Sequence, residues 1–296
     1  MAVKTYYGES FGKTVLEIYT ENKSKNTKIT HRRLEDQDAY DTWHLSYYLK
    51  EILRTRNFIN SGVESLEKLE RKDKNLISYL ILASNPDLLD VVEIGSSLFE
   101  MIDGLRAVNE FSKNKNIFNL DLENFNYVGI ELSNLLRDAT RNLYPNHKIK
   151  LYETVDQFQE PIGFLCDRSV TNYALETCEE LSDLMNRAQV CYLNTYFSKK
   201  QTFITSRLGK KVTYFSLQDV CKLSTKPIYH IYGEKAPGPF SGEDISRGNS
   251  VLEGFFICAN EARVLKFFEY ANLDPEFSSF FLEKNIKMKL AKELVE

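Results

Sequence analysis

The sequence predicts an α/β fold: a doubly wound, mostly parallel seven-stranded sheet that ends in an antiparallel hairpin, preceded by an N-terminal helical cap. Three observations predict it. Short apolar runs alternate with helix-length amphipathic segments between residues 86 and 260, which is typical of parallel strands joined by right-handed crossovers. The first 85 residues are polar and helical in period. Two strand-like runs lie on either side of Gly209, close enough together to form a hairpin.

Changes of hydrophobic period divide the chain into three regions, since no internal repeat or low-complexity tract marks a linker. Residues 1–85 form the helical cap on the substrate side, with amphipathic stretches at 42–54 and 66–82. Residues 86–260 form the core, and residues 261–296 form a C-terminal helical extension. A chain of 296 residues suits one enlarged core with appendages.

Strands and helices follow one another in the core. Five apolar runs predict strands, at residues 88–94, 127–130, 149–152, 162–166 and 190–196. The segments with helical period lie at 98–111, 133–143 and 172–187. A hairpin over 202–217, strand-like runs at 228–232 and 255–259, and a Gly/Pro loop at 236–249 complete the core.

Composition excludes several classes of protein. Lys and Arg total 38 against 42 Asp and Glu, so the formal net charge is −4 and no cationic field attracts nucleic acid. The five cysteines show no C-x-x-C spacing, which indicates buried thiols in a reducing compartment and predicts no metal site. No signal peptide is evident, and no apolar run approaches the roughly 20 residues that cross a bilayer. We therefore expect a cytoplasmic protein with neither a nucleic acid nor a membrane as partner.

The run DVVEIGSSLFE, from residue 90, is an apolar strand that ends in a glycine and two small residues before a helix. Such a turn lets a ligand approach the backbone at the carboxyl end of a strand. The run resembles motif I of class I S-adenosylmethionine-dependent methyltransferases, with Ser97 in place of the second glycine and Phe99 in place of the third. By that resemblance the cofactor-binding residues include Ser96 and also Glu93, Gly95 and Ser97. The last three would line the methionine part of S-adenosylmethionine, with Glu93 near its ammonium end.

Glu131 follows the second predicted strand directly, and a carboxylate there can accept both hydroxyl hydrogens of a ribose. The same acid also favours a helix start, which is the alternative interpretation. The resemblance implies that Glu131 and Leu132 contact the adenosyl group. It also implies that Glu153 and Thr154, after the third strand, lie near the adenine amine. The loop after the fourth strand would bring Asp167 and Arg168 near the cofactor, and Tyr173 is a further candidate there.

The catalytic candidates are His230, Asp167 and His44. An imidazole titrates near neutral pH and can accept the proton of a hydroxyl acceptor, although a histidine among aromatic residues is often structural. Asp167 could instead cap the helix that follows it. Arg32 and Arg33 could hold an acidic acceptor or form a solvated basic face. Several aromatic side chains could line an acceptor site or belong to the core: Tyr47, Tyr48, Tyr196, Phe197, Tyr229 and Tyr232.

The resemblance implies methyl transfer from S-adenosylmethionine to oxygen or nitrogen of a small organic molecule, with the cap and the 236–249 loop closing over it. A possible homodimer is a further expectation. Two alternatives are a degenerate methyltransferase-like scaffold or binding protein without catalysis, and an NAD(P)-dependent oxidoreductase. The oxidoreductase requires G-x-G-x-x-G, whereas residues 95–100 read GSSLFE.

Overall fold

A computed structural model describes residues 37–67, 72–168, 170–207, 210–232, 251–277 and 287–295. Predictions for Arg32, Arg33, the turn at Gly209, the 236–249 loop and the side chain of Tyr232 lie outside the described residues.

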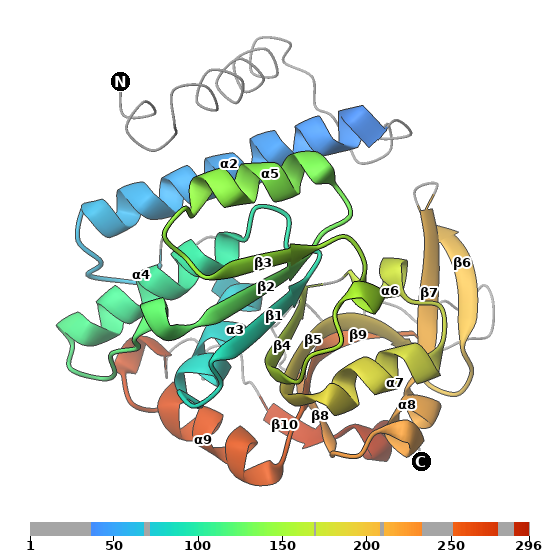
Figure 1. Cartoon of the computed structure of the whole chain (residues 1–296). Helices are drawn as coiled ribbons and strands as arrows, with labels where there is room; N and C mark the ends of the chain where they lie inside the picture. The colour runs from blue at the N-terminus through green and yellow to red at the C-terminus, as the bar shows by residue number, and fades with distance from the viewer. Residues whose placement is uncertain are drawn as a thin grey trace.

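A single large sheet organises the molecule (Figure 1). Its strands follow the order β10-β8-β9-β5-β4-β1-β2-β3, and a ribbon of β6 and β7 branches from β5. The strand bounds are β1 Asp90–Ile94, β2 Asn126–Ile130, β3 Ile149–Tyr152, β4 Ile162–Arg168, β5 Ala188–Ser198, β6 Phe203–Arg207, β7 Lys210–Ser216, β8 Ile228–Tyr232, β9 Val251–Cys258 and β10 Lys287–Leu290.

The strand directions confirm the predicted doubly wound sheet, although the described residues form ten strands where the sequence predicted seven. β1 pairs in parallel with both β2 and β4, so the chain reverses its winding direction between these two neighbours. β2–β3 and β4–β5 are also parallel, whereas β9 is antiparallel to both β5 and β8. Open sheets of this kind bind ligands at the carboxyl ends of their strands, beside the point where the winding reverses.

Helices cover both faces of the sheet (Figure 1). One apolar cluster joins α2, α3, α4, α5 and α9 to one face, and a second cluster joins α7, α8 and η6 to the other. The bounds are α2 Gln37–Asn60, α3 Lys72–Ala83, α4 Glu100–Asn114, η3 Leu122–Asn124, α5 Asn134–Leu143, η4 Val155–Gln157, α6 Thr171–Ala174, α7 Cys178–Arg187, α8 Leu217–Leu223, α9 Glu261–Ala271 and η6 Ala291–Leu294.

Two predicted elements differ in the structure. The helix expected over 172–187 is broken: α6 ends at Ala174, and Thr177 starts α7 with a capping box in which its side chain and that of Glu180 each accept a backbone N–H. The C-terminal extension, predicted to be helical, does contain the helix α9, but Lys287–Leu290 forms the strand β10, antiparallel to β8. Its pairing partner lies over fifty residues earlier in the chain, and periodicity within one segment does not reveal such a partner.

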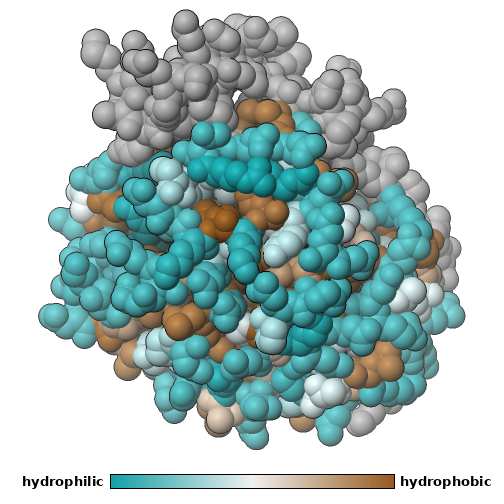
Figure 2. All heavy atoms as spheres, in the orientation of Figure 1, coloured by the Kyte–Doolittle hydropathy of each residue, from teal (hydrophilic) through white to brown (hydrophobic). Residues whose placement is uncertain are grey.

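The surface in the view of Figure 2 is mostly hydrophilic, with hydrophobic atoms confined to small patches. Among the described residues, no helix combines the length and apolar character needed to cross a bilayer.

Candidate functional site

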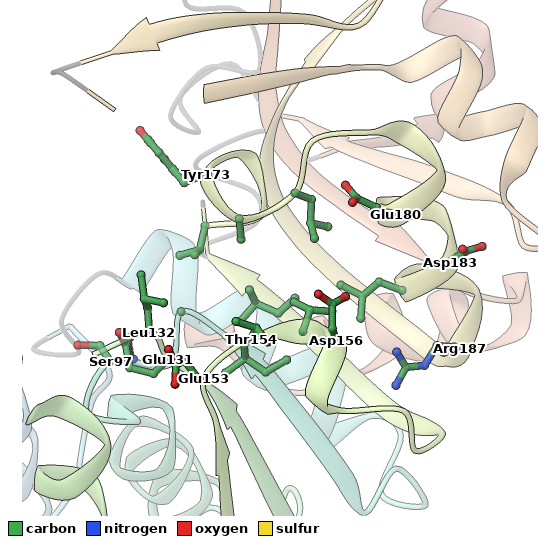
Figure 3. Close-up of a pocket in the computed structure, with 18 of the residues that line it drawn as sticks. Ser97, Glu131, Leu132, Glu153, Thr154, Asp156, Tyr173, Glu180, Asp183 and Arg187 are labelled. Atoms are coloured by element: carbon green, nitrogen blue, oxygen red, sulfur yellow. Dashed lines mark hydrogen bonds between the residues drawn. The ribbon is translucent and has the colours of Figure 1, made fainter. Parts of the chain in front are cut away.

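A cleft of about 1080 Å³ lies at the carboxyl ends of β1, β2 and β3, between the N-terminal half of α2 and the segments α6 and α7. Figure 3 shows its two ends: Ser97, Glu131 and Glu153 lie on one side, and α7 presents Glu180 and Arg187 on the other. This volume is at the upper limit of ordinary small-molecule pockets, so the cleft can accommodate a nucleoside-sized ligand together with a second molecule.

The turn after β1 forms part of the cleft wall at Gly95 and Ser97. Gly95 has a φ of +64°, and a Cβ there would lie 2.3 Å from the Cγ2 atom of Val170. Only glycine therefore fits at this position. Ser97 and Phe99 also have positive φ values, of 49° and 56°, so the turn keeps a glycine-like backbone where the sequence has other residues.

Ser97 contributes polar groups to this wall. Its backbone N–H donates to Oε2 of Glu131 over 3.0 Å. Its hydroxyl is buried and has no hydrogen-bond partner among the described residues. Ser96 is fully buried and does not line the cleft.

Glu131 extends from the end of β2 into the same cleft. Its Oε1 accepts the backbone N–H of Ser133 over 2.9 Å, which with the Ser97 contact fixes the carboxylate. Burial raises the pKa of Glu131 above its ordinary range, and the two N–H donors oppose this shift. The predicted juxtaposition of Gly95 and Glu131 is thus present: neighbouring strand ends bring a small-residue turn and a carboxylate to one cavity.

Three other predicted cofactor residues line the cleft: Leu132, Glu153 and Thr154. Leu132 is 64% exposed and offers an apolar surface. The buried Arg137 pairs with Glu153 at 3.5 Å and donates to the carbonyl oxygens of Glu131 and Leu132. Arg137 therefore fixes the ends of β2 and β3 relative to each other.

Glu93 and Arg168 do not line the cleft. Arg168 forms ion pairs with Glu93 and, at 3.0 Å, with Glu100, and all three side chains are nearly buried. Burial raises the pKa of Glu93, which Arg168 opposes. The Arg168 guanidinium thus already pairs with the Glu93 carboxylate, which the resemblance assigned to the ammonium end of the cofactor.

Asp167 is also outside the cleft. It accepts hydrogen bonds from the backbone N–H groups of Val170 and Thr171 and from the Thr171 hydroxyl, at 2.8, 3.0 and 2.7 Å. Burial raises its pKa to about 6. These contacts match the alternative interpretation, in which Asp167 holds the start of α6.

The two candidate histidines lie in different places. His44 lines the cleft beside Tyr48, with ring centroids 5.5 Å apart. His230 is fully buried on β8, stacked on Phe256 at 4.9 Å, and burial lowers its pKa to about 3. Two of the predicted aromatic residues line the cleft: Tyr48, and Tyr173 from the loop that follows Asp167. Four others do not line it: Tyr47, Tyr196, Phe197 and Tyr229.

The α7 side of the cleft was not foreseen from the sequence. It includes Asp156 and Gln159 after β3, and Glu180, Asp183 and Arg187 on α7. The Arg187 guanidinium donates to the carbonyl oxygens of Phe158 and Glu160 at 2.6 and 3.0 Å. Polar residues on a surface helix do not reveal in the sequence that they line a cavity. Here this wall of the cavity forms because the chain breaks between α6 and α7.

No protein-family model matches the chain, and no curated protein sequence does. Solved structures with a related arrangement include the N-terminal domain of EvdMO1 in the presence of SAH and D-fucose, at 8% identity and a TM-score of 0.42, over 72% of this chain and 97% of that one. Another is the O-methyltransferase from a trans-AT PKS multienzyme of Brevibacillus brevis in complex with S-adenosyl-L-homocysteine, at 10% identity and a TM-score of 0.42, over 78% and 85%.

A third is SAM-bound CalS10, an amino pentose methyltransferase from Micromonospora echinaspora, at 10% identity and a TM-score of 0.39, over 64% and 91%. We assign the fold of this chain from its own strand order and strand directions. The chain therefore has a Rossmann-like doubly wound fold, with a glycine turn and an acid at adjacent strand ends.

Proposed function

We propose that this chain transfers a methyl group from S-adenosylmethionine to oxygen or nitrogen of a small organic molecule. The observation that supports this function best is the shared cleft of Gly95 and Glu131, with the Glu131 carboxylate hydrogen-bonded to Ser97 N–H over 3.0 Å. A carboxylate has about four acceptor positions, and backbone donors occupy two of them here. The remaining lone pairs can accept the hydroxyl hydrogens of a ribose.

The residues present fit the adenosyl part of this cofactor. Glu131 would accept from the ribose, Leu132 would cover one side of the base, and Thr154 would lie at its edge. The methionine part finds a different environment from the one the sequence suggested, because Glu93 is already paired with Arg168. Its polar groups would instead lie against the turn at Gly95 and Ser97, which forms this part of the cleft wall.

The cofactor supplies an activated methyl group with a good leaving group, so the protein mainly has to align the acceptor and exclude water. Tyr48 and Tyr173 offer aromatic walls for an organic acceptor. His44 is the histidine of the cleft and can take the proton of an acceptor that reacts as a hydroxyl. His230 has no such access.

Calorimetry with S-adenosylmethionine tests this function. We expect micromolar binding by the full chain, loss of binding in Glu131→Ala, and unchanged binding in Glu160→Ala. Glu160 is a matched control because it is an exposed acid that pairs with Lys150 and does not line the cleft. Mass spectrometry of the purified protein for a retained cofactor is an independent measurement.

A scaffold without catalysis is the second candidate. It is favoured by Ser97 and Phe99 in place of glycine and by the Glu93–Arg168 pair. The absence of any heat from wild-type protein at high S-adenosylmethionine concentration would support the scaffold and contradict methyl transfer. A thermal shift with NADH would address the oxidoreductase alternative.

A further inference from the structure

A second, smaller hollow of about 180 Å³ lies at the C-terminal ends of α2 and α5. α2 contributes His44 and Tyr48 to the cleft and Arg56 and Asn60 to the hollow. α5 begins just after Glu131 and ends in the turn that lines the hollow. Figure 1 shows these two helices side by side. No residue is shared between the linings of the two cavities.

Two guanidinium groups from different helices meet at the hollow. Arg56 is 8% exposed, and its Nε donates to both carboxylate oxygens of Asp103 over 3.0 Å. Arg106 makes a longer contact of 3.4 Å with the same carboxylate, and its side chain is 44% exposed. One buried carboxylate thus contacts two permanent cations, and Arg56 also donates from Nη2 to the carbonyl oxygen of Leu143 over 3.3 Å.

His147 adds a third nitrogen group. It lies in the turn after α5 and lines the hollow, and its Nδ1 is buried without a hydrogen-bond partner among the described residues. Burial, and next the charge of Arg106, lower the pKa of His147. A neutral imidazole can donate one hydrogen bond, and a protonated imidazole can donate from both nitrogens.

We propose that this hollow binds a tetrahedral oxyanion, either free phosphate or the phosphoryl group of a larger molecule, through Arg106, Arg56 and His147. The chemistry fits because guanidinium groups recognise phosphate oxygens with paired, charge-assisted hydrogen bonds. The volume corresponds to about six molecules of liquid water, enough for such an anion and too small for a whole cofactor. An anion here connects α2, α4 and the end of α5, and so holds the helix that carries His44.

Phosphate titration of the full chain, followed by calorimetry, tests the proposal. We expect saturable binding and an affinity about tenfold weaker in Arg106→Gln, the loss of one charge-assisted hydrogen bond. Arg141→Gln is the matched control, because Arg141 is an exposed arginine of α5 that pairs with Asp138 outside the hollow. The Arg106 side chain is 44% exposed, so Arg106→Gln should leave the fold intact.

The NMR titration of the His147 ring is a second measurement. Bound phosphate should raise the pKa of His147, because an anion stabilises the imidazolium. The charged and titratable groups around it are Arg56 of α2, Asp103 and Arg106 of α4, Glu123 of η3, Tyr127 of β2 and Tyr144. Arg106→Gln should diminish this rise, and Arg141→Gln should not.

A parallel titration with a sugar phosphate distinguishes the two sources of the anion. Tighter binding of the sugar phosphate than of phosphate assigns the hollow to a phosphorylated molecule, and equal binding assigns it to the free ion. Equal affinity of Arg106→Gln and wild type for phosphate, or no response of His147 at saturating phosphate, would overturn the proposal. Failure of S-adenosylmethionine binding would leave it intact, since the two linings are separate.

Discussion

Ser97 holds a backbone conformation that serine rarely adopts. Its φ of 49° places it in the left-handed region, which costs a residue with a Cβ about 1–2 kcal/mol relative to glycine. The position lies in the turn that faces the cleft, so the retained conformation keeps its N–H directed at Glu131. The turn thus has a backbone shape that glycine favours, although serine stands where the motif that it resembles has its second glycine.

We expect Ser97→Gly to stabilise the protein by roughly 0.5–1 kcal/mol, because relief of the backbone strain exceeds the added entropy of the unfolded chain. Urea denaturation measures the change. Ser96→Gly is the control, since Ser96 is a buried serine of the same turn without positive φ, and it should lose stability. Equal destabilisation by the two substitutions would contradict the strain argument.

Glu131 gives the cleft a pH dependence. Burial raises its pKa, and only the ionised carboxylate offers all its lone pairs to a ribose. Adenosyl-ligand affinity should therefore be full at high pH and fall as the pH drops through this raised pKa, at a higher pH than for an ordinary carboxyl group. Calorimetry across a pH series measures it. Glu131→Gln should bind weakly with no such dependence, and an unchanged pH profile in that variant would refute the assignment.

At the scale of elements, the break between α6 and α7 shapes the cleft. Leu175 lies in the break and lines the cleft together with Tyr173 and Ala174 of α6 and with Glu180 and Asp183 of α7. Thr177 starts α7 by accepting the N–H of Glu180 at 3.2 Å, and the Glu180 carboxylate accepts the N–H of Thr177 at 3.0 Å. A continuous helix would not place Glu180 and Asp183 along this wall.

Thr177→Ala should destabilise the protein by about 1 kcal/mol, the usual effect of losing an N-cap side chain. Chemical denaturation measures the change. Thr154→Ala is a matched control: Thr154 precedes η4 in the same position but makes no side-chain capping hydrogen bond. A loss of stability as large in Thr154→Ala as in Thr177→Ala would show that capping is not the cause.

At the scale of the whole molecule, His230 on β8, one strand in from the β10 edge of the sheet, makes the stability of the fold depend on pH in acid. It lies opposite Phe256 on β9 and Lys289 on β10, and burial lowers its pKa to about 3. The folded state therefore binds a proton less readily than the unfolded state, whose histidine has an ordinary pKa of about 6.5. The resulting stability is complete above the ordinary pKa and is lost as the pH falls toward about 3.

The free energy of unfolding should fall by about 2 kcal/mol less between neutral pH and about pH 5 in His230→Phe than in the wild type. Thermal or urea unfolding at both pH values measures this difference. His44→Phe is the control, because His44 is only partly buried and should contribute less. The same acid sensitivity in His230→Phe and wild type would exclude His230 as its source.

The predicted elements that the structure confirms are those with local signals. Ile149–Tyr152 and Ile162–Arg168 are short apolar strands, and Ser133 caps α5 by accepting the N–H of Leu136 at 3.2 Å. Gly95 and Glu131 could be placed together because the carboxyl ends of adjacent parallel strands share an edge. The domain boundaries, the acceptor, the homodimer and the cytoplasmic location stay predictions.

The sequence by itself determined the alternation of strands and helices, and with it the edge where a glycine turn and a carboxylate meet, because both follow from local periodicity and strand direction. Only the tertiary structure decided that Arg168 pairs with Glu93, that His44 and not His230 reaches the cleft, and that α7 forms its far wall. Those outcomes depend on which side chains meet across elements, and packing and desolvation in the folded molecule set them.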